Sequence, residues 1–258
     1  MADERSTNAT DSPHRPLTWQ AAFDDPVEWV AAVQARLPDQ PAVASGSASR
    51  TRIGLAFELA VGLVLVVDAY QDRIARLPVE RAEWIRAQVE LYRLAGGHDQ
   101  VGSLLQAACY MAALDEFVVK YGLWGSAEQA LQITTMLIGM DWPAKLWTAA
   151  EGELRALWSV HCASGREELH SWGDVVVSVP LQRSTGVCGE FVSAYADLIV
   201  GPLLVEIKTG HVSSDWDLRD AYDQLARYAR LAPAAGHPIT TLGLYLARYG
   251  QLLTWPVK

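Results

Sequence analysis

Apolar residues recur every three or four positions through most of the chain before residue 173, which is the spacing of one face of a helix. The segment 24–37, DDPVEWVAAVQARL, begins with an Asp cap and an early proline, as many helices do. An irregular connector rich in Pro, Gly and Ser follows at 38–49. The pattern predicts further helices at 51–77, 79–95, 100–122, 126–139 and 142–163.

The pattern changes after residue 173, where β-branched residues become frequent and strands are expected. Gly201 and Pro202 make a tight turn between two of them, so the first three strands should form an antiparallel meander. The helix 213–232 has Ser214 and Asp217 at the spacing of a capping box, and Pro233 and Gly236 close it. The predicted strands are 174–181, 190–200, 203–210, 240–250 and 251–258, which gives the order β-β-β-α-β-β.

The chain therefore divides into a polar, disordered tail at 1–16, a helical region at 17–173 and a strand-rich core at 174–258. With 258 residues, half of them hydrophobic, it can bury a sizeable core. The longest apolar stretch, 59–67, is bounded by Glu58 and Asp68 and predicts a buried helix, not a membrane span. The polar N-terminus lacks the pattern of a secretion signal, so we expect a cytoplasmic protein.

The net charge bears on nucleic-acid binding, and the cysteine content bears on disulfides and zinc sites. The net charge of −9 and the pI near 5.1 mean that the overall field does not attract nucleic acid, so such binding needs a local basic patch, a metal ion or a partner. Three scattered cysteines, Cys109, Cys162 and Cys188, suggest neither disulfides nor a zinc site, and we expect them to be buried.

Three charges interrupt the otherwise apolar stretch 196–210, ADLIVGPLLVEIKTG. Glu206 and Lys208 share one face of a strand, because alternate residues of a strand point the same way. The turn at Gly201 sets Asp197 on the neighbouring strand, across from them. Two carboxylates suit Mg²⁺ or Mn²⁺, and a nearby ammonium can orient a metal-bound water or neutralise charge on phosphorus. In the ordinary alternative, Glu206 and Lys208 pair on a solvated face of the sheet.

This arrangement resembles the PD-(D/E)XK nuclease superfamily: an Asp, eight residues, then Glu-Ile-Lys on a hairpin, followed by a helix. Gln224 and Tyr228 on that helix have the Q-x-x-x-Y spacing of the RecB-like exonuclease branch. The resemblance covers residues 174–258 and implies a restriction-endonuclease-like α/β core, in which helices flank a mixed sheet. It also implies a Mg²⁺-dependent DNase in which Asp197 and Glu206 hold the metal, Lys208 positions and activates water, and Gln224 and Tyr228 orient the lysine or the strand.

Relatives usually carry another acidic residue on a helix before the first strand. Glu58, in the apolar pattern G-x-x-F-E, is the favoured candidate, and Glu151 and Glu153 are the alternative. If Glu58 is the ligand, a core helix at 52–67 precedes a helical insertion at 71–165. Several RecB-like nucleases hold an iron-sulfur cluster through four cysteines, but this chain has three, so we expect no cluster.

Several functional alternatives remain open at this point. The chain is either a DNase or a non-catalytic, nuclease-like scaffold, or else an obligate subunit of a larger nucleic-acid-processing complex. Expected partners are single- or double-stranded DNA and a protein partner or a second copy, in DNA repair, phage or mobile-element biology, or defence. Arg219, Arg227 and Arg230 could form a basic strip for DNA or pair with acids on their own helix.

Overall fold

The structure, a computed structural model, describes most of the chain. The described residues are 25–66, 68–75, 77, 79–95, 100–120, 142–184, 191–212 and 215–257. Within them, the side chains of 117–120, 142–143, 182–184, 191–193 and 215–216 are not described. The predicted tail at 1–16, the predicted helix at 126–139, Cys188 and the predicted cap Ser214 lie outside the described residues.

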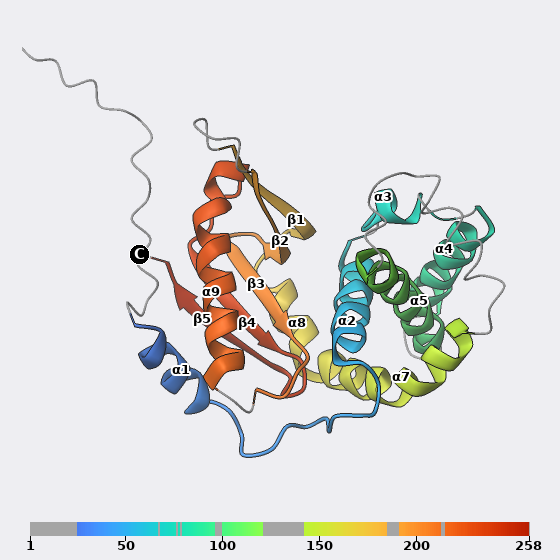
Figure 1. Cartoon of the computed structure of the whole chain (residues 1–258), viewed down its shortest axis with the longest axis horizontal. Coiled ribbons are helices and arrows are strands. Elements are labelled where there is room, and N and C mark those ends of the chain that lie inside the picture. The colour runs from blue at the N-terminus through green and yellow to red at the C-terminus, as the bar shows by residue number, and fades with distance from the viewer. Residues whose placement is uncertain are drawn as a thin grey trace, which may run out of the picture.

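The protein is a mixed α/β structure built on a five-stranded sheet with helices on both faces (Figure 1). The strands are β1 (Val175–Ser184), β2 (Phe191–Val200), β3 (Leu203–Lys208), β4 (Thr241–Leu246) and β5 (Gln251–Pro256). They lie side by side in chain order, antiparallel except for the parallel pair β3 and β4. The predicted order β-β-β-α-β-β and the antiparallel meander of the first three strands are confirmed.

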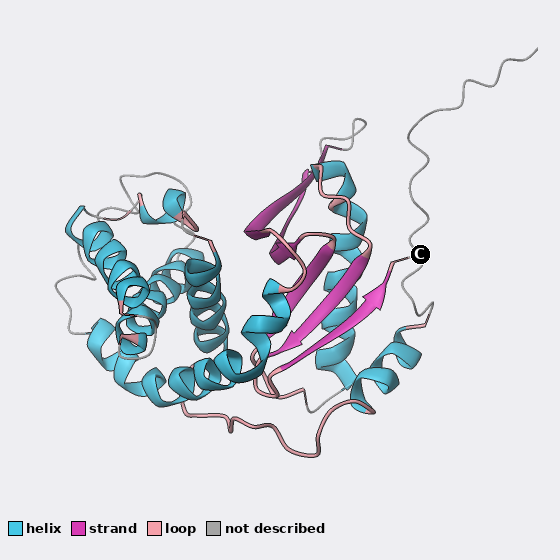
Figure 2. Ribbon diagram, turned by 180° about the vertical axis from the view of Figure 1, so that it is seen from behind, coloured by secondary structure: helices cyan, strands magenta, loops and turns pink. Residues whose placement is uncertain are grey.

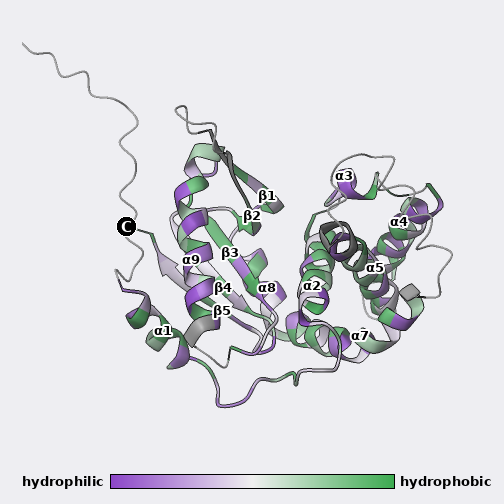
Figure 3. Ribbon diagram, viewed as in Figure 1, coloured by the Kyte–Doolittle hydropathy of each residue, from purple (hydrophilic) through white to green (hydrophobic). Residues whose placement is uncertain are grey.

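One face of the sheet is covered by α9 (Asp215–Leu231), the crossover between the two parallel strands, and by α1 (Pro26–Gln34). Helix α9 buries Leu218, Ala221, Leu225 and Ala229, which recur at helical spacing, and hydrophilic and hydrophobic residues alternate along it in Figure 3. At the start of α1, the side chain of Asp25 accepts a hydrogen bond of 2.8 Å from the backbone of Val27, as the sequence predicts.

The helical region covers the other face, seen from behind in Figure 2. Its elements are α2 (Arg50–Leu65), α3 (Gln71–Ile74), α4 (Val79–Leu94), α5 (Val101–Lys120), α7 (Trp142–Val160), a π-helical turn at His161–Gly165 and α8 (Arg166–His170). Helix α2 packs against the sheet and buries Phe57, whose ring stacks on Tyr245 of β4. Among the described helices, none is both long and apolar enough to span a membrane.

Some predicted details are wrong. Residues 51–77 do not form one helix: α2 ends at Leu65, and Tyr70 then adopts a left-handed backbone (φ 61°) that turns the chain into α3. Its ring packs against Gly62, where a Cβ would lie 2.5 Å from the Tyr70 hydroxyl. Strand β4 stops at Leu246 because Gly250 (φ 63°) closes a turn before β5. Cys109 is buried as expected, but Cys162 is exposed on the π-helical turn.

Candidate active site

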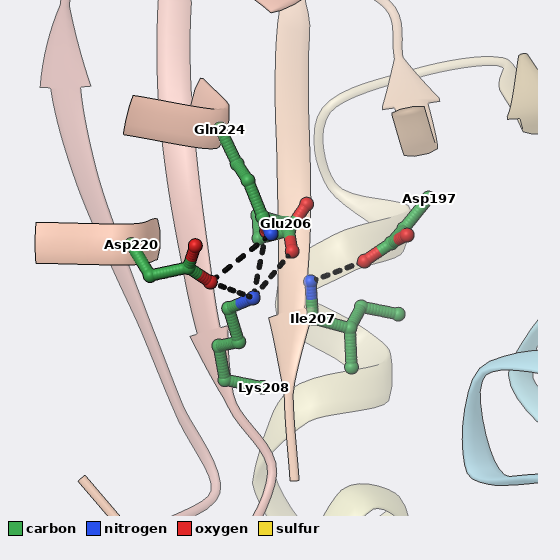
Figure 4. A network of polar contacts seen from close by, with 6 residues as sticks. All are labelled: Asp197, Glu206, Ile207, Lys208, Asp220 and Gln224. Atoms are coloured by element: carbon green, nitrogen blue, oxygen red, sulfur yellow. Dashed lines mark hydrogen bonds and ion pairs between the residues drawn. The ribbon is translucent and has the colours of Figure 1, made fainter. Parts of the chain in front are cut away.

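Strands β2 and β3 pair only near their connecting turn, and Asp197 marks the point where they separate. Their pairing ends at Leu198 opposite Val205. Beyond it, Asp197 Oδ2 accepts a hydrogen bond of 2.7 Å from the backbone N–H of Ile207 (Figure 4). The carboxylate thus takes the N–H that the sheet no longer pairs, and this bond fixes its position beside β3.

The same point reverses the two faces of the β1–β2 ribbon. Before Asp197, Ala194 and Ala196 face the core under α9, whereas after it Leu198 faces the helical region. Ser178, which the register places opposite Asp197, has a left-handed backbone (φ 48°) that allows β1 to reverse as well. The reversal opens the sheet at Asp197 and turns the rest of the ribbon away from β3.

Glu206 and Lys208 lie on the face of β3 beneath α9. Lys208 Nζ is 2.8 Å from Glu206 Oε1 and donates a hydrogen bond of 2.7 Å to Gln224 Oε1. Gln224 Nε2 in turn donates to Asp220 at 3.1 Å, and Asp220 is 3.8 Å from the lysine amine (Figure 4). Glu206 is only 5% exposed, and its second oxygen, Oε2, is buried without a hydrogen-bond partner. This oxygen has capacity left to bind a ligand.

Helix α2 brings Glu58 to the same place. One turn before Glu58, Gly54 lies against Thr209, so close that a Cβ would be 3.0 Å from the Thr209 hydroxyl. Residues four apart share a helical face, so Glu58 also faces the end of β3. Burial raises the pKa of Glu58 to about 7, a rise that the Arg73 guanidinium opposes. The carboxylate of Glu206 raises the Glu58 pKa further.

The site carboxylates repel one another. Burial is the main cause that raises the pKa of Asp197 well above its usual range, and Glu206 and Glu58 add to the rise. Burial also raises the pKa of Glu206, although Lys208 opposes this change. Among the described residues, no three Asp, Glu, His or Cys side chains lie close enough together to form a complete metal-binding group. The oxygen donors, their repulsion and the unpaired Glu206 oxygen nevertheless fit a hard divalent cation such as Mg²⁺.

The remaining predicted residues separate into those near the site and those elsewhere. Tyr228 is a buried residue of α9, and its pKa is raised by burial first, then by Glu206 and Asp197. Glu151 forms an exposed ion pair of 2.8 Å with Arg155 on the same helix. Glu153 binds the buried Arg248 and accepts from the backbone of Gly46 at 3.0 Å. Of the acidic candidates on helices, the structure therefore brings Glu58 to the site and engages the other two elsewhere.

The three arginines of α9, Arg219, Arg227 and Arg230, are all exposed. Arg227 is exposed, and its guanidinium carbon lies 5.5 Å from the centre of the Tyr228 ring. Arg230 donates to the backbone oxygen of Ala226 at 3.2 Å, as part of its own helix. Arg219 is exposed on α9. Arg227 also lowers the pKa of Glu206.

Sequence reasoning missed two neighbours of the site. Asp220 lies four residues before Gln224, and this helical spacing was a signal that could have found it. Arg73 of α3 donates to Asp115 of α5 at 2.9 Å and to the Ser178 hydroxyl at 3.2 Å, opposite Asp197 in the ribbon. No sequence signal identifies Arg73, because it lies more than a hundred residues before β2. Only the packing of the helical region brings it to the site.

Comparison with known protein families, with curated proteins and with solved structures found no match for this chain. A proposal about its function therefore rests on the residues of the site.

Proposed function

We propose that the protein is a metal-dependent DNase of the PD-(D/E)XK superfamily, of the RecB-like branch, that hydrolyses phosphodiester bonds. The observation that carries the proposal is that Asp197 binds the backbone of Ile207, between Glu206 and Lys208, at the point where β2 leaves β3. A carboxylate pair with raised pKa values and one unpaired oxygen is costly unless a ligand compensates it. A divalent cation provides that compensation.

Asp197 and Glu206 would hold the metal, with Glu58 of α2 as the accessory ligand. When bound, the metal would polarise the phosphate and lower the pKa of a coordinated water. Lys208 supplies a positive charge next to these carboxylates, where it can orient the attacking water or stabilise the charge on the phosphate. Gln224 holds the lysine amine in that position through its 2.7 Å hydrogen bond.

The fold and the surface charge bear on the proposal in opposite ways. A mixed sheet flanked by helices supports a restriction-endonuclease-like core, which the resemblance of residues 174–258 implies. The net charge of −9 opposes tight binding to DNA. An acidic protein can still bind DNA at a small site where a metal ion supplies positive charge. Lys208 and Arg227 add positive charge near the same site.

The decisive experiment is cleavage of linear and circular DNA, each single- and double-stranded, with Mg²⁺, with Mn²⁺ and with EDTA. We expect cleavage by the wild type that requires metal and is lost in Lys208→Ala and in Glu206→Gln. Cleavage of circular DNA would identify an endonuclease, and cleavage of linear DNA alone an exonuclease.

Glu151→Gln is the matched control, because Glu151 is an exposed helix carboxylate paired with Arg155 and lies outside the network of the site. It should cut like the wild type. A folded wild-type protein that cuts none of these substrates with either metal would contradict the proposal. It would favour the non-catalytic scaffold or the obligate subunit instead.

A further inference from the structure

Tyr195 is an exposed aromatic side chain on the strand that carries Asp197. It is 54% exposed, whereas most large apolar residues of the sheet are buried. Two residues of a strand span about 6.6 Å, so Tyr195 begins one such step from the proposed metal ligand. The exposed ring is accessible to a ligand beside the candidate active site, and its face can stack on another ring.

Tyr195 points away from α9. Its neighbours Ala194 and Ala196 are buried in the core under α9. Because successive residues of a strand point to opposite faces, the side chain of Tyr195 lies on the other face of the ribbon. Pro180 lies opposite Tyr195 in β1 and is exposed as well. The outer face of the ribbon thus has an exposed Pro-Tyr pair, and its tyrosine lies two residues before Asp197 in β2.

The guanidinium of Arg73 lies near this part of the β1–β2 ribbon. The Arg73 side chain is 34% exposed, and its guanidinium bonds to Ser178, which lies opposite Asp197. Arg73 therefore stands beside the step between Tyr195 and the carboxylates. A stacking ring followed by a guanidinium is the pair of groups that binds a base and its neighbouring phosphate in proteins that hold single strands.

We propose that Tyr195 is a stacking platform for an unpaired nucleobase next to the scissile phosphate, with Arg73 beside the intervening backbone. This inference rests on the proposed nuclease function and specifies its substrate as a strand with unpaired bases. In a duplex, the base faces are covered by their neighbours, so an aromatic ring can stack only on a base that is unstacked or at an end.

The test measures the binding of labelled oligonucleotides to the full chain by fluorescence anisotropy, with Ca²⁺ in place of Mg²⁺ to suppress cleavage. Its arms are single-stranded DNA, single-stranded RNA and duplex DNA. Tyr195→Ala should weaken binding of single-stranded DNA about ten- to a hundredfold, as the loss of one stacked base does. Binding of the duplex should not change. Tyr195→Phe keeps the ring and should bind like the wild type.

Val176→Ala is the matched control. Val176 is also exposed on the ribbon, at 43%. It lies directly opposite Ile199, which packs on the α9 side, so Val176 is on the other face from Tyr195. Its truncation should leave binding unchanged. A 2-aminopurine base in the single strand gives a readout specific to stacking: its fluorescence should fall on binding to the wild type and to Tyr195→Phe, and not on binding to Tyr195→Ala.

The outcomes separate this inference from the nuclease proposal. If Tyr195→Ala binds single strands and quenches 2-aminopurine like the wild type, or weakens single strands and duplex equally, the platform is wrong even where Lys208-dependent cleavage is found. If the wild type binds single strands through Tyr195 but never cuts, the platform stands and the nuclease proposal fails. Stacking on RNA as strong as on DNA supports the platform and shows that it does not read the sugar.

Discussion

The amine of Lys208 lies 2.8 Å from a carboxylate oxygen of Glu206, two residues earlier in the same strand. The pair faces α9, where Gln224 accepts a second hydrogen bond from the amine. One oxygen of a nearly buried carboxylate is thereby compensated and the other is left unpaired. The lysine is consequently held at the carboxylates by the protein alone, before any substrate arrives.

Gln224→Ala tests this positioning. We expect kcat for DNA cleavage to fall about ten- to a hundredfold with little change in KM, because a hydrogen bond to a charged group that orients Lys208 is lost. Single-turnover cleavage in Mg²⁺ measures the effect. Asp223→Ala, an exposed change on the same helix, is the control and should cut at the wild-type rate. A fall in affinity with unchanged kcat would instead mean that Gln224 contacts the substrate.

Asp197 has two roles, which two substitutions separate. Asp197→Asn keeps an oxygen that can accept from Ile207, so the free energy of unfolding should match or exceed that of the wild type, while metal-dependent cleavage is lost. Asp197→Ala leaves the Ile207 N–H without its partner and should lower the free energy of unfolding by about 1–3 kcal/mol. Urea denaturation without metal measures both. Equal stability of the two variants would show that the hydrogen bond does not hold β2 at this point.

Glu58 should make the metal-free protein less stable as pH rises. Its pKa is about 7 in the folded state against an ordinary value of 4.5, so the folded state binds more protons between these values. The free energy of unfolding therefore decreases as pH rises from 4.5 to 7, and Glu58→Gln should reduce this slope. Urea denaturation in EDTA at several pH values measures it. A slope unchanged in Glu58→Gln would contradict the burial of its charge.

The affinity for a metal ion should increase as pH rises, because the same Glu58 carboxyl must lose its proton to bind the metal. Metal binding requires ionised carboxylates, so affinity for Mn²⁺ should decrease as pH falls below about 7. Isothermal titration calorimetry of the wild type and of Glu58→Gln compares the two profiles. The variant should bind Mn²⁺ more weakly, with less dependence on pH, if Glu58 is the accessory ligand.

Glu153 and Glu151 should differ sharply in their effect on stability. Glu153→Ala leaves the guanidinium of Arg248, which is 1% exposed, without its carboxylate. We expect a loss of about 3–5 kcal/mol in the free energy of unfolding, because an unpaired charge remains buried. Glu151→Ala removes an exposed pair and should cost less than about 1 kcal/mol. Similar losses in both variants would show that the Arg248 pair is not structurally important.

The local pattern of residues predicted most of the sheet and its order. The β-branched run before Ser178, the Gly201-Pro202 turn and the amphipathic spacing of α9 are short-range signals, and each led to an element that the structure contains. The helix predicted at 51–77 was wrong because its end depends on the Tyr70 ring packing against Gly62. Such packing between residues eight apart leaves no trace in the apolar spacing.

The sequence by itself determined that Glu206 and Lys208 share one face of a strand and that Gln224 and Asp220 share one face of a helix, because both periods are properties of the backbone. Only the tertiary structure decided which distant groups join them. The separation of β2 from β3 fixes Asp197, and the packing of Gly54 against Thr209 brings Glu58 to the site instead of Glu153. These choices depend on contacts between segments far apart in the chain, which local periodicity does not encode.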